Sequence, residues 1–116
     1  MKVLFIDDDS MMLRMAGFIL KKGGHEAFTA ESGAEGLRLI EEWRPELVFI
    51  DVEMPQMNGF ETLEAIKKSG NTELRVCMMS GTVNDEITEQ ALRLGAEGVI
   101  EKPLNAAEVN AVINRQ

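Results

Sequence analysis

Carboxylate side chains follow two apolar segments of this sequence at the point where each segment ends. Three aspartates, Asp7–Asp9, come directly after the apolar run Val3–Ile6. A single aspartate, Asp51, comes directly after the run Leu47–Ile50. If both runs are central parallel strands, these carboxylates converge at one edge of a sheet, and a cation must offset their mutual repulsion. Hard oxygen donors with room for water suit magnesium, with manganese as the alternative.

A simpler interpretation applies to part of the acidic run. Asp7 or Asp9, taken alone, fits equally well as a helix cap or a solvated loop residue. The same reading fits Asp51 less well, because the segment Val52–Pro55 that follows it offers no helix start to cap.

Two more polar pairs follow apolar segments, namely Ser80-Gly81 and Lys102-Pro103. A hydroxyl, an ammonium group, a metal ion and backbone N–H groups are what phosphoryl transfer requires, because its catalysis consists of positioning and charge neutralisation. Gly81 has no side chain to keep the backbone away from such a group. We expect Asp51 to be the only carboxylate at the end of a central strand opposite Lys102, and therefore the acceptor.

Strands and helices are predicted to alternate along the chain. The expected strands are Val3–Ile6, Glu26–Thr29, Leu47–Ile50, Leu74–Met79 and Gly98–Ile100. Apolar residues at helical spacing mark the helices: Met12, Met15, Ala16, Ile19 and Leu20; Ala34, Leu37 and Ile40; Gly59, Leu63 and Ile66; Ile87, Ala91 and Leu94; Ala106, Val109, Val112 and Ile113. Ser10 is expected to cap the first helix. The alternation predicts right-handed crossovers and a mostly parallel sheet, with functional groups at the carboxyl ends of its strands.

Composition limits the function classes. The 116 residues suit one domain, residues 1–116, and 45% of them are hydrophobic, enough for a core without disulfides. A net charge of −8 argues against direct binding to nucleic acid. No apolar stretch is long enough to span a membrane, and the N-terminus does not resemble a signal peptide. The single cysteine, Cys77, fits a buried thiol in a reducing compartment such as the cytoplasm.

The polar motifs together resemble those of the receiver domains of bacterial two-component response regulators, of the kind found in chemotaxis regulators. The resemblance covers essentially the whole chain and rests on Asp7-Asp8, Asp51-Val52-Glu53-Met54-Pro55, Met57-Asn58-Gly59, Ser80-Gly81 and Lys102-Pro103. It implies an α/β, flavodoxin-like (βα)5 three-layer sandwich with a five-stranded parallel sheet of order 2-1-3-4-5.

The resemblance also implies the roles of individual residues at a magnesium site. Asp51 corresponds to the phosphoacceptor, which also contacts the metal. Asp8 corresponds to a direct metal ligand, Asp7 to a ligand that acts partly through water, and Glu53 to a ligand through its backbone carbonyl.

Further residues correspond to those that hold the phosphoryl group in the family. The Ser80 hydroxyl and the Lys102 ammonium group are expected to contact its oxygens. The backbone amides of Glu53 and Gly81 would complete the cradle, and the peptide bond before Pro103 is expected to be cis.

A receiver domain implies signalling partners. We expect a sensor histidine kinase or phosphotransfer protein as donor, with small-molecule phosphodonors as an alternative. An output domain or effector is expected on the face formed by the fourth helix, fifth strand and fifth helix. The chain is expected to be a monomer or a phosphorylation-linked dimer, and to catalyse only its own phosphorylation and dephosphorylation. The sequence fits a stand-alone regulator and a part of a longer protein equally well.

Two departures from the family pattern concern output and signal lifetime. Val99 stands where the family usually has an aromatic residue that switches rotamer, so a different moving element is expected. Glu53 and Thr82 occupy the positions that tune the lifetime of the phosphoryl group, and neither has a side-chain amide that positions water. We expect dephosphorylation at an ordinary or slow rate.

Two rival functions fit the residues less well. A phosphohydrolase of the haloacid-dehalogenase type requires an Asp-x-Asp-x-Thr/Val motif, and Met11 stands at its last position. A receiver that serves only as a scaffold would lack the acceptor or the acidic pair, and both are present here.

Overall fold

A five-stranded sheet forms the centre of the molecule, and in this computed structural model residues 1–71 and 73–115 are described. Its strand order is β2-β1-β3-β4-β5, with every neighbouring pair parallel. The elements in chain order are β1 (Lys2–Ile6), α1 (Ser10–Lys22), β2 (Glu26–Ala30), α2 (Gly33–Trp43), β3 (Leu47–Asp51), α3 (Gly59–Lys68), β4 (Arg75–Ser80), α4 (Asp85–Arg93), β5 (Gly98–Glu101) and α5 (Ala106–Ile113). The predicted fold class and strand order are confirmed.

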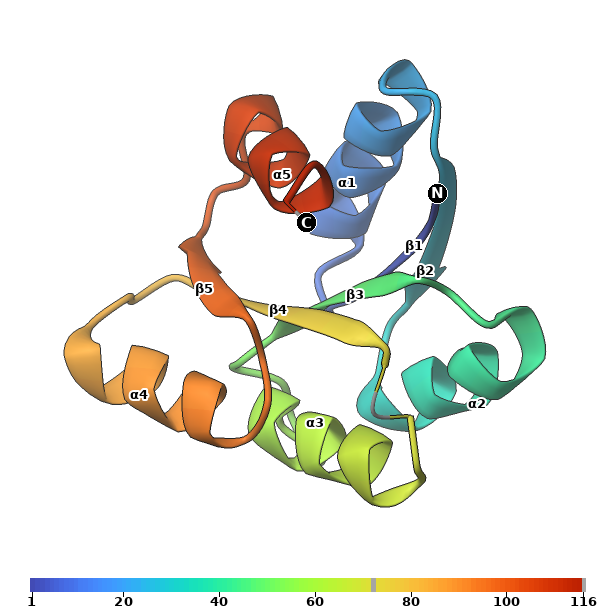
Figure 1. Cartoon of the computed structure of the whole chain (residues 1–116). Coiled ribbons are helices and arrows are strands. Elements are labelled where there is room, and N and C mark those ends of the chain that lie inside the picture. Colours follow the sequence, from blue (N-terminus) through green and yellow to red (C-terminus); the bar gives the residue numbers. More distant parts are fainter. Residues whose placement is uncertain (72, 116) are drawn as a thin grey trace.

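Helices cover both faces of the sheet (Figure 1). Helices α1 and α5 lie on one face, and α2, α3 and α4 lie on the other. Side chains of β1 alternate between the two cores, so that Phe5 belongs to the α1–α5 side and Leu4 to the opposite side. Phe5 stacks on Phe49 of β3 with ring centroids 4.4 Å apart. Burial on both faces explains why β1 and β3 are almost continuously apolar.

The start of α1 differs from the expectation. Asp9, and not Ser10, is the cap: its side chain accepts hydrogen bonds from the backbone N–H groups of Met11 and Met12 at 3.0 and 3.4 Å. Both residue types are good caps, and the sequence alone did not show at which one the helical turn closes.

Met15 was predicted to lie in the buried stripe of α1, and this is wrong. Its side chain is 45% exposed, whereas Met12 and Ala16 on either side of it are buried. The apolar stripe on this helix is wider than the face that the sheet covers, so part of it lies on the surface.

Among the residues that the structure describes, no helix is long and apolar enough to cross a membrane.

Candidate functional site

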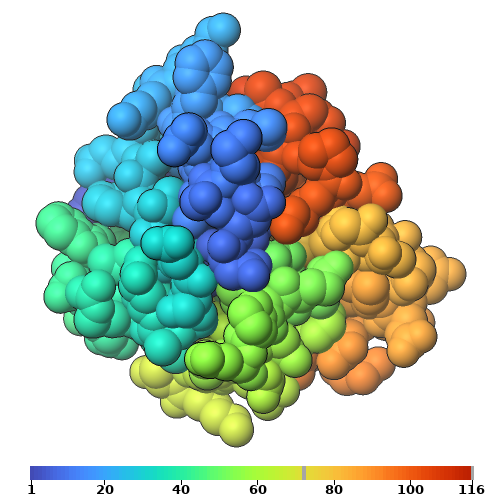
Figure 2. Space-filling view, turned by 180° about the vertical axis from the view of Figure 1, so that it is seen from behind, coloured from blue at the N-terminus to red at the C-terminus, as the bar shows by residue number. Residues whose placement is uncertain are grey.

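The acidic residues meet at the carboxyl edge of the sheet. Asp7 follows β1 directly, and Asp51 is the last residue of β3, which pairs with β1. Both carboxylates are buried. Seen from this side, N-terminal, central and C-terminal segments of the chain meet on one face (Figure 2). The parallel topology thus brings distant parts of the sequence to a single site.

Three of the aspartates form a group that could hold a metal ion. Carboxylate oxygens of Asp7, Asp8 and Asp51 all lie within 4.8 Å of one another. Asp8 is exposed and leaves room for water, whereas Asp7 is buried and its Oδ2 faces the Lys102 ammonium group. Asp9 faces the helix instead and caps α1. Clustered oxygen donors with one open side are the ligands that magnesium prefers.

Lys102 lies between two of these carboxylates, which corrects the expectation that Asp51 alone would face it. Its Nζ is 3.0 Å from Asp7 Oδ2 and 3.4 Å from Asp51 Oδ1. The physical reason is that β1, like β3, is an interior strand, so Asp7 points into the same crevice. Burial opposes the charged form of Lys102, but contact with Asp7 and the charge of Asp51 hold its pKa above the ordinary value. The peptide bond between Lys102 and Pro103 is cis, as expected from the resemblance.

Asp51 is an unusually weak acid in the absence of a metal ion. Burial first, and then the charge of Asp7, raise the pKa of its carboxyl group to about 7, although Lys102 opposes the shift. A bound divalent cation favours the ionised carboxylate, which is the form that acts as a nucleophile.

Ser80, the last residue of β4, is buried and makes its hydrogen bonds to Glu53 and Thr82. Its Oγ lies 2.9 and 3.2 Å from the two carboxylate oxygens of Glu53. It also donates to the Thr82 carbonyl at 2.7 Å and accepts from the Thr82 N–H at 3.1 Å. The sequence analysis placed Ser80 and the Glu53 backbone at the site but missed this side-chain contact.

Gly59 was named in a motif and in the predicted third helix, but its steric role beside Asp51 was not predicted. A Cβ atom at this position would overlap the Asp51 carbonyl oxygen and crowd Met78. The loop that joins β3 to α3 is fixed by hydrogen bonds from Val52 N to Met79 O and from Gly59 N to Val52 O, at 2.8 and 3.1 Å. Asn58 caps α3 within a capping box. Gly59 therefore lets the start of α3 lie against the backbone of Asp51.

Gly81 does not lie in a crowded environment. A Cβ atom there would meet no atom within 4 Å. A side chain at this position would point into open space, so no steric contact of the folded chain requires glycine there.

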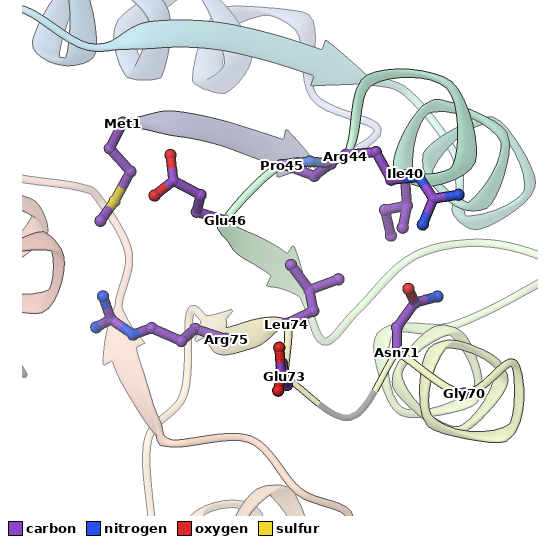
Figure 3. Close-up of a pocket in the computed structure, with 10 residues that line it drawn as sticks. All are labelled: Met1, Ile40, Arg44, Pro45, Glu46, Gly70, Asn71, Glu73, Leu74 and Arg75. Carbon is purple, nitrogen blue, oxygen red and sulfur yellow. The ribbon is translucent and has the colours of Figure 1, made fainter.

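A separate cavity of about 540 Å³ lies at the other end of the sheet, where β1, β3 and β4 begin (Figure 3). Arg44 and Asn71 lie on one side of it, and Met1, Glu46 and Arg75 on the other. Arg75 is already paired with Glu97 at 2.7 Å. None of the acidic site residues lines this cavity, so it is not part of the site.

The sequence matches the family described as the response regulator receiver domain over residues 3–114, and the chain belongs to this family. It is 34% identical to the chemotaxis protein CheY of Bacillus subtilis, covering 98% of this chain and 95% of that protein. It is also 40% identical to a protein-glutamate methylesterase/protein-glutamine glutaminase of Koribacter versatilis, covering 88% of this chain but only 29% of that protein. Many relatives are thus much longer than the segment they share with this chain.

Solved structures support the same assignment. The chemotaxis protein CheY4 of Vibrio cholerae superposes with a TM-score of 0.92 at 30% identity, covering 98% of this chain and 96% of that one. The receiver domain of NtrX from Brucella abortus superposes with a TM-score of 0.89 at 35% identity, covering 97% and 95%. The chain is therefore a signalling receiver domain, and its aspartate cluster is compatible with phosphoryl acceptance and magnesium binding.

Proposed function

We propose that Asp51 accepts the phosphoryl group and that residues 1–116 act as one receiver domain. The observation that carries the proposal is the convergence of Asp7, Asp8 and Lys102 around the Asp51 carboxylate at one edge of the sheet. This arrangement combines a nucleophile with the charges that phosphoryl transfer needs.

Asp7, Asp8 and Asp51 would hold a magnesium ion, and Glu53 would add its backbone carbonyl. The crowding of three carboxylates whose oxygens lie within 4.8 Å of one another supports this assignment, because Lys102 supplies one positive charge and a second cation would offset the remaining repulsion. Magnesium supplies positive charge to the phosphoryl oxygens, and manganese offers the same coordination chemistry.

In the transfer step, an ionised Asp51 oxygen attacks the phosphorus atom of the donor. A new O–P bond forms as the bond between phosphorus and the leaving group breaks, and the leaving group keeps that electron pair. Lys102 pairs with the phosphoryl group as it arrives, and the Ser80 hydroxyl donates to one of its oxygens. The Glu53 N–H, already 3.4 Å from Asp51 Oδ1, and the Gly81 N–H complete the cradle.

We propose a histidine kinase or phosphotransfer protein as the donor, docked on α1. Met11, Met15 and Phe18 are 69%, 45% and 68% exposed and, at spacings of four and three residues, form one apolar stripe along the helix. Met11 and Met15 also line a cavity together with Lys102, so this stripe leads to the acceptor site. A helical partner with an apolar face fits such a stripe.

The docking proposal has a test that separates it from the chemistry. Phe18→Glu should slow transfer from a phosphorylated kinase by roughly tenfold or more, while acetyl phosphate labels it at the wild-type rate. Leu92→Glu is the matched control, because Leu92 is 51% exposed on α4, away from the site. Equal loss with both donors would contradict docking on α1.

We propose that an output domain or effector binds the face formed by α4, β5 and α5. The domain would act as a monomer or a phosphorylation-linked dimer, in the cytoplasm, where the free and buried Cys77 stays reduced. It would catalyse only its own phosphorylation and dephosphorylation, and it would bind neither nucleic acid nor membrane directly.

Incubation with acetyl phosphate and magnesium tests acceptor identity. Mass spectrometry of the intact protein should show one added phosphoryl group, and Asp51→Asn should abolish it. Undiminished labelling of the substituted protein would disprove the assignment. Turnover of a generic phosphate ester would instead favour a phosphohydrolase.

A further inference from the structure

The Glu53 side chain accepts a hydrogen bond from the Ser80 hydroxyl, which the proposed function assigns to the phosphoryl group as a donor. Its carboxylate oxygens are the acceptors at 2.9 and 3.2 Å from Ser80 Oγ. Ser80 is buried, while Glu53 itself is exposed at the rim of the crevice. The side chain therefore reaches inward from the rim to the hydroxyl.

The Ser80 hydroxyl has one proton to donate. That proton is already shared between the Glu53 carboxylate and the Thr82 carbonyl, 2.7 Å away. A phosphoryl group on Asp51 would add a third acceptor, with three oxygens and nearly two negative charges. It can receive this proton only if both Glu53 and Thr82 lose it.

Charge drives the Glu53 side chain away from Ser80 once a phosphoryl group is present. Glu53 follows Asp51 by two residues, and its N–H lies 3.4 Å from Asp51 Oδ1. A phosphoryl dianion beside this carboxylate creates like-charge repulsion in a partly buried site. The exposed Glu53 side chain can swing into water, whereas the Thr82 carbonyl belongs to the backbone and can lose the proton only if Ser80 or the loop after β4 moves.

We infer that Glu53 is a positioning residue that holds the Ser80 hydroxyl in the unphosphorylated protein and must release it before the phosphorylated state can form. The inference rests on the proposed function and adds to it a competition between two anions for one donor. Glu53 thereby favours the unphosphorylated state and sets the threshold for switching.

The test measures binding of beryllofluoride, an unreactive phosphoryl mimic, in excess magnesium by amide NMR signals. Glu53→Gln, which keeps the shape but removes the charge, should tighten binding by about tenfold, the size expected for a hydrogen bond to a charged group. Glu64→Gln makes the same change in net charge from an exposed position on α3 and should leave binding unchanged. No tightening in Glu53→Gln would overturn the inference.

A second comparison separates hydroxyl competition from simple charge repulsion. In a Ser80→Ala background, the gain in beryllofluoride affinity from Glu53→Gln should fall to a small part of its wild-type value. In a Ser80→Thr background, which keeps the hydroxyl, the gain in affinity should be preserved. An equal gain in the Ala and Ser backgrounds would show that Glu53 acts by charge alone and would overturn the inference.

A third measurement needs neither metal nor mimic. Because the Thr82 N–H donates to the same Ser80 oxygen, Glu53→Gln should shift the amide signals of Ser80 and Thr82 in the metal-free protein. Unmoved signals would show that the contact is absent. If wild type and variants all fail to bind beryllofluoride, the proposed function fails and this inference fails with it.

Discussion

At the scale of the residue, the protonation of Asp51 links the aspartate cluster to the stability of the fold. The pKa of Asp51 is raised from 3.8 to about 7, so the folded protein binds a proton here more tightly than the unfolded chain does. The stability that this group contributes is complete below its unfolded pKa and is lost as pH rises through about 7. An ionised, metal-free Asp51 therefore destabilises the fold.

Asp51→Asn should accordingly stabilise the metal-free protein at pH 8 but not at acidic pH. We expect the free energy of unfolding to rise by about 2 kcal/mol at pH 8. This is about half of what the full pKa shift of Asp51 implies, because water reaches the crevice. Urea unfolding in the presence of a chelator, from pH 5 to 8, measures it. Glu64→Gln is the control for a change in net charge. If the free energy of unfolding depends on pH in the same way for Asp51→Asn, Glu64→Gln and the wild type, the raised pKa of Asp51 is contradicted.

Neighbouring aspartates in the acidic run should have separable effects. Asp8→Ala removes a carboxylate from the cluster and should weaken magnesium binding by roughly tenfold or more. Asp9→Ala removes a helix cap and should cost about 1 kcal/mol of stability while leaving magnesium affinity nearly unchanged. Magnesium titration and urea unfolding of both variants distinguish the roles, and identical behaviour would show that our division of the run is wrong.

At the scale of the element, Gly59 lets α3 approach the end of β3 closely. Gly59→Ala should destabilise the protein by about 2 kcal/mol or more, because the new Cβ would overlap the Asp51 carbonyl oxygen. Gly17→Ala is the matched control: it lies within α1, has no atom within 4 Å of the added Cβ, and should be neutral or stabilising by up to about 1 kcal/mol. Unfolding midpoints measure both, and equal effects would contradict the steric argument.

The elements were also where sequence reasoning was strongest. Apolar runs and helical spacing predicted every strand and helix, because β1 and β3 are buried on both faces and each helix packs apolar side chains against the sheet. The strand order came from the resemblance to a family, since the pattern alone does not specify which strands are neighbours.

Contacts that depend on side-chain conformation could not be predicted. The reach of Glu53 to Ser80 and the position of Lys102 between Asp7 and Asp51 depend on rotamers, which residue spacing does not encode. The exposure of Met15 depends on how far α1 is rotated against the sheet.

At the scale of the whole molecule, the proposed function requires a signal to travel from Asp51 to the face formed by α4, β5 and α5. Val99 is β-branched and stiff about χ1, and it packs partly buried against the core beside α4. The loop after β4 is the alternative route, because Ser80 bonds both the N–H and the carbonyl of Thr82. Moving Ser80 toward a phosphoryl group strains or breaks those bonds, two residues before the cap of α4 at Asn84.

Beryllofluoride should therefore shift the amide signals of residues 81–86 and of α4. The shift reflects a change of a few kcal/mol at most in the free-energy difference between the two conformations. Two-dimensional NMR with and without the mimic checks this. Changes confined to the loop between β3 and α3, with residues 81–86 unaffected, would contradict the proposed route.

The site joins residues from nearly opposite ends of the chain, since Asp7 and Lys102 meet through their side chains. Ribosomes make proteins from the N-terminus, and domains tend to fold as units once enough chain is available. A nascent chain can expose its acidic cluster early, but the cation that pairs with it is added only after β5 has been made. Competence to carry a signal thus arrives late in synthesis, and truncated products that end before Lys102 cannot complete the site.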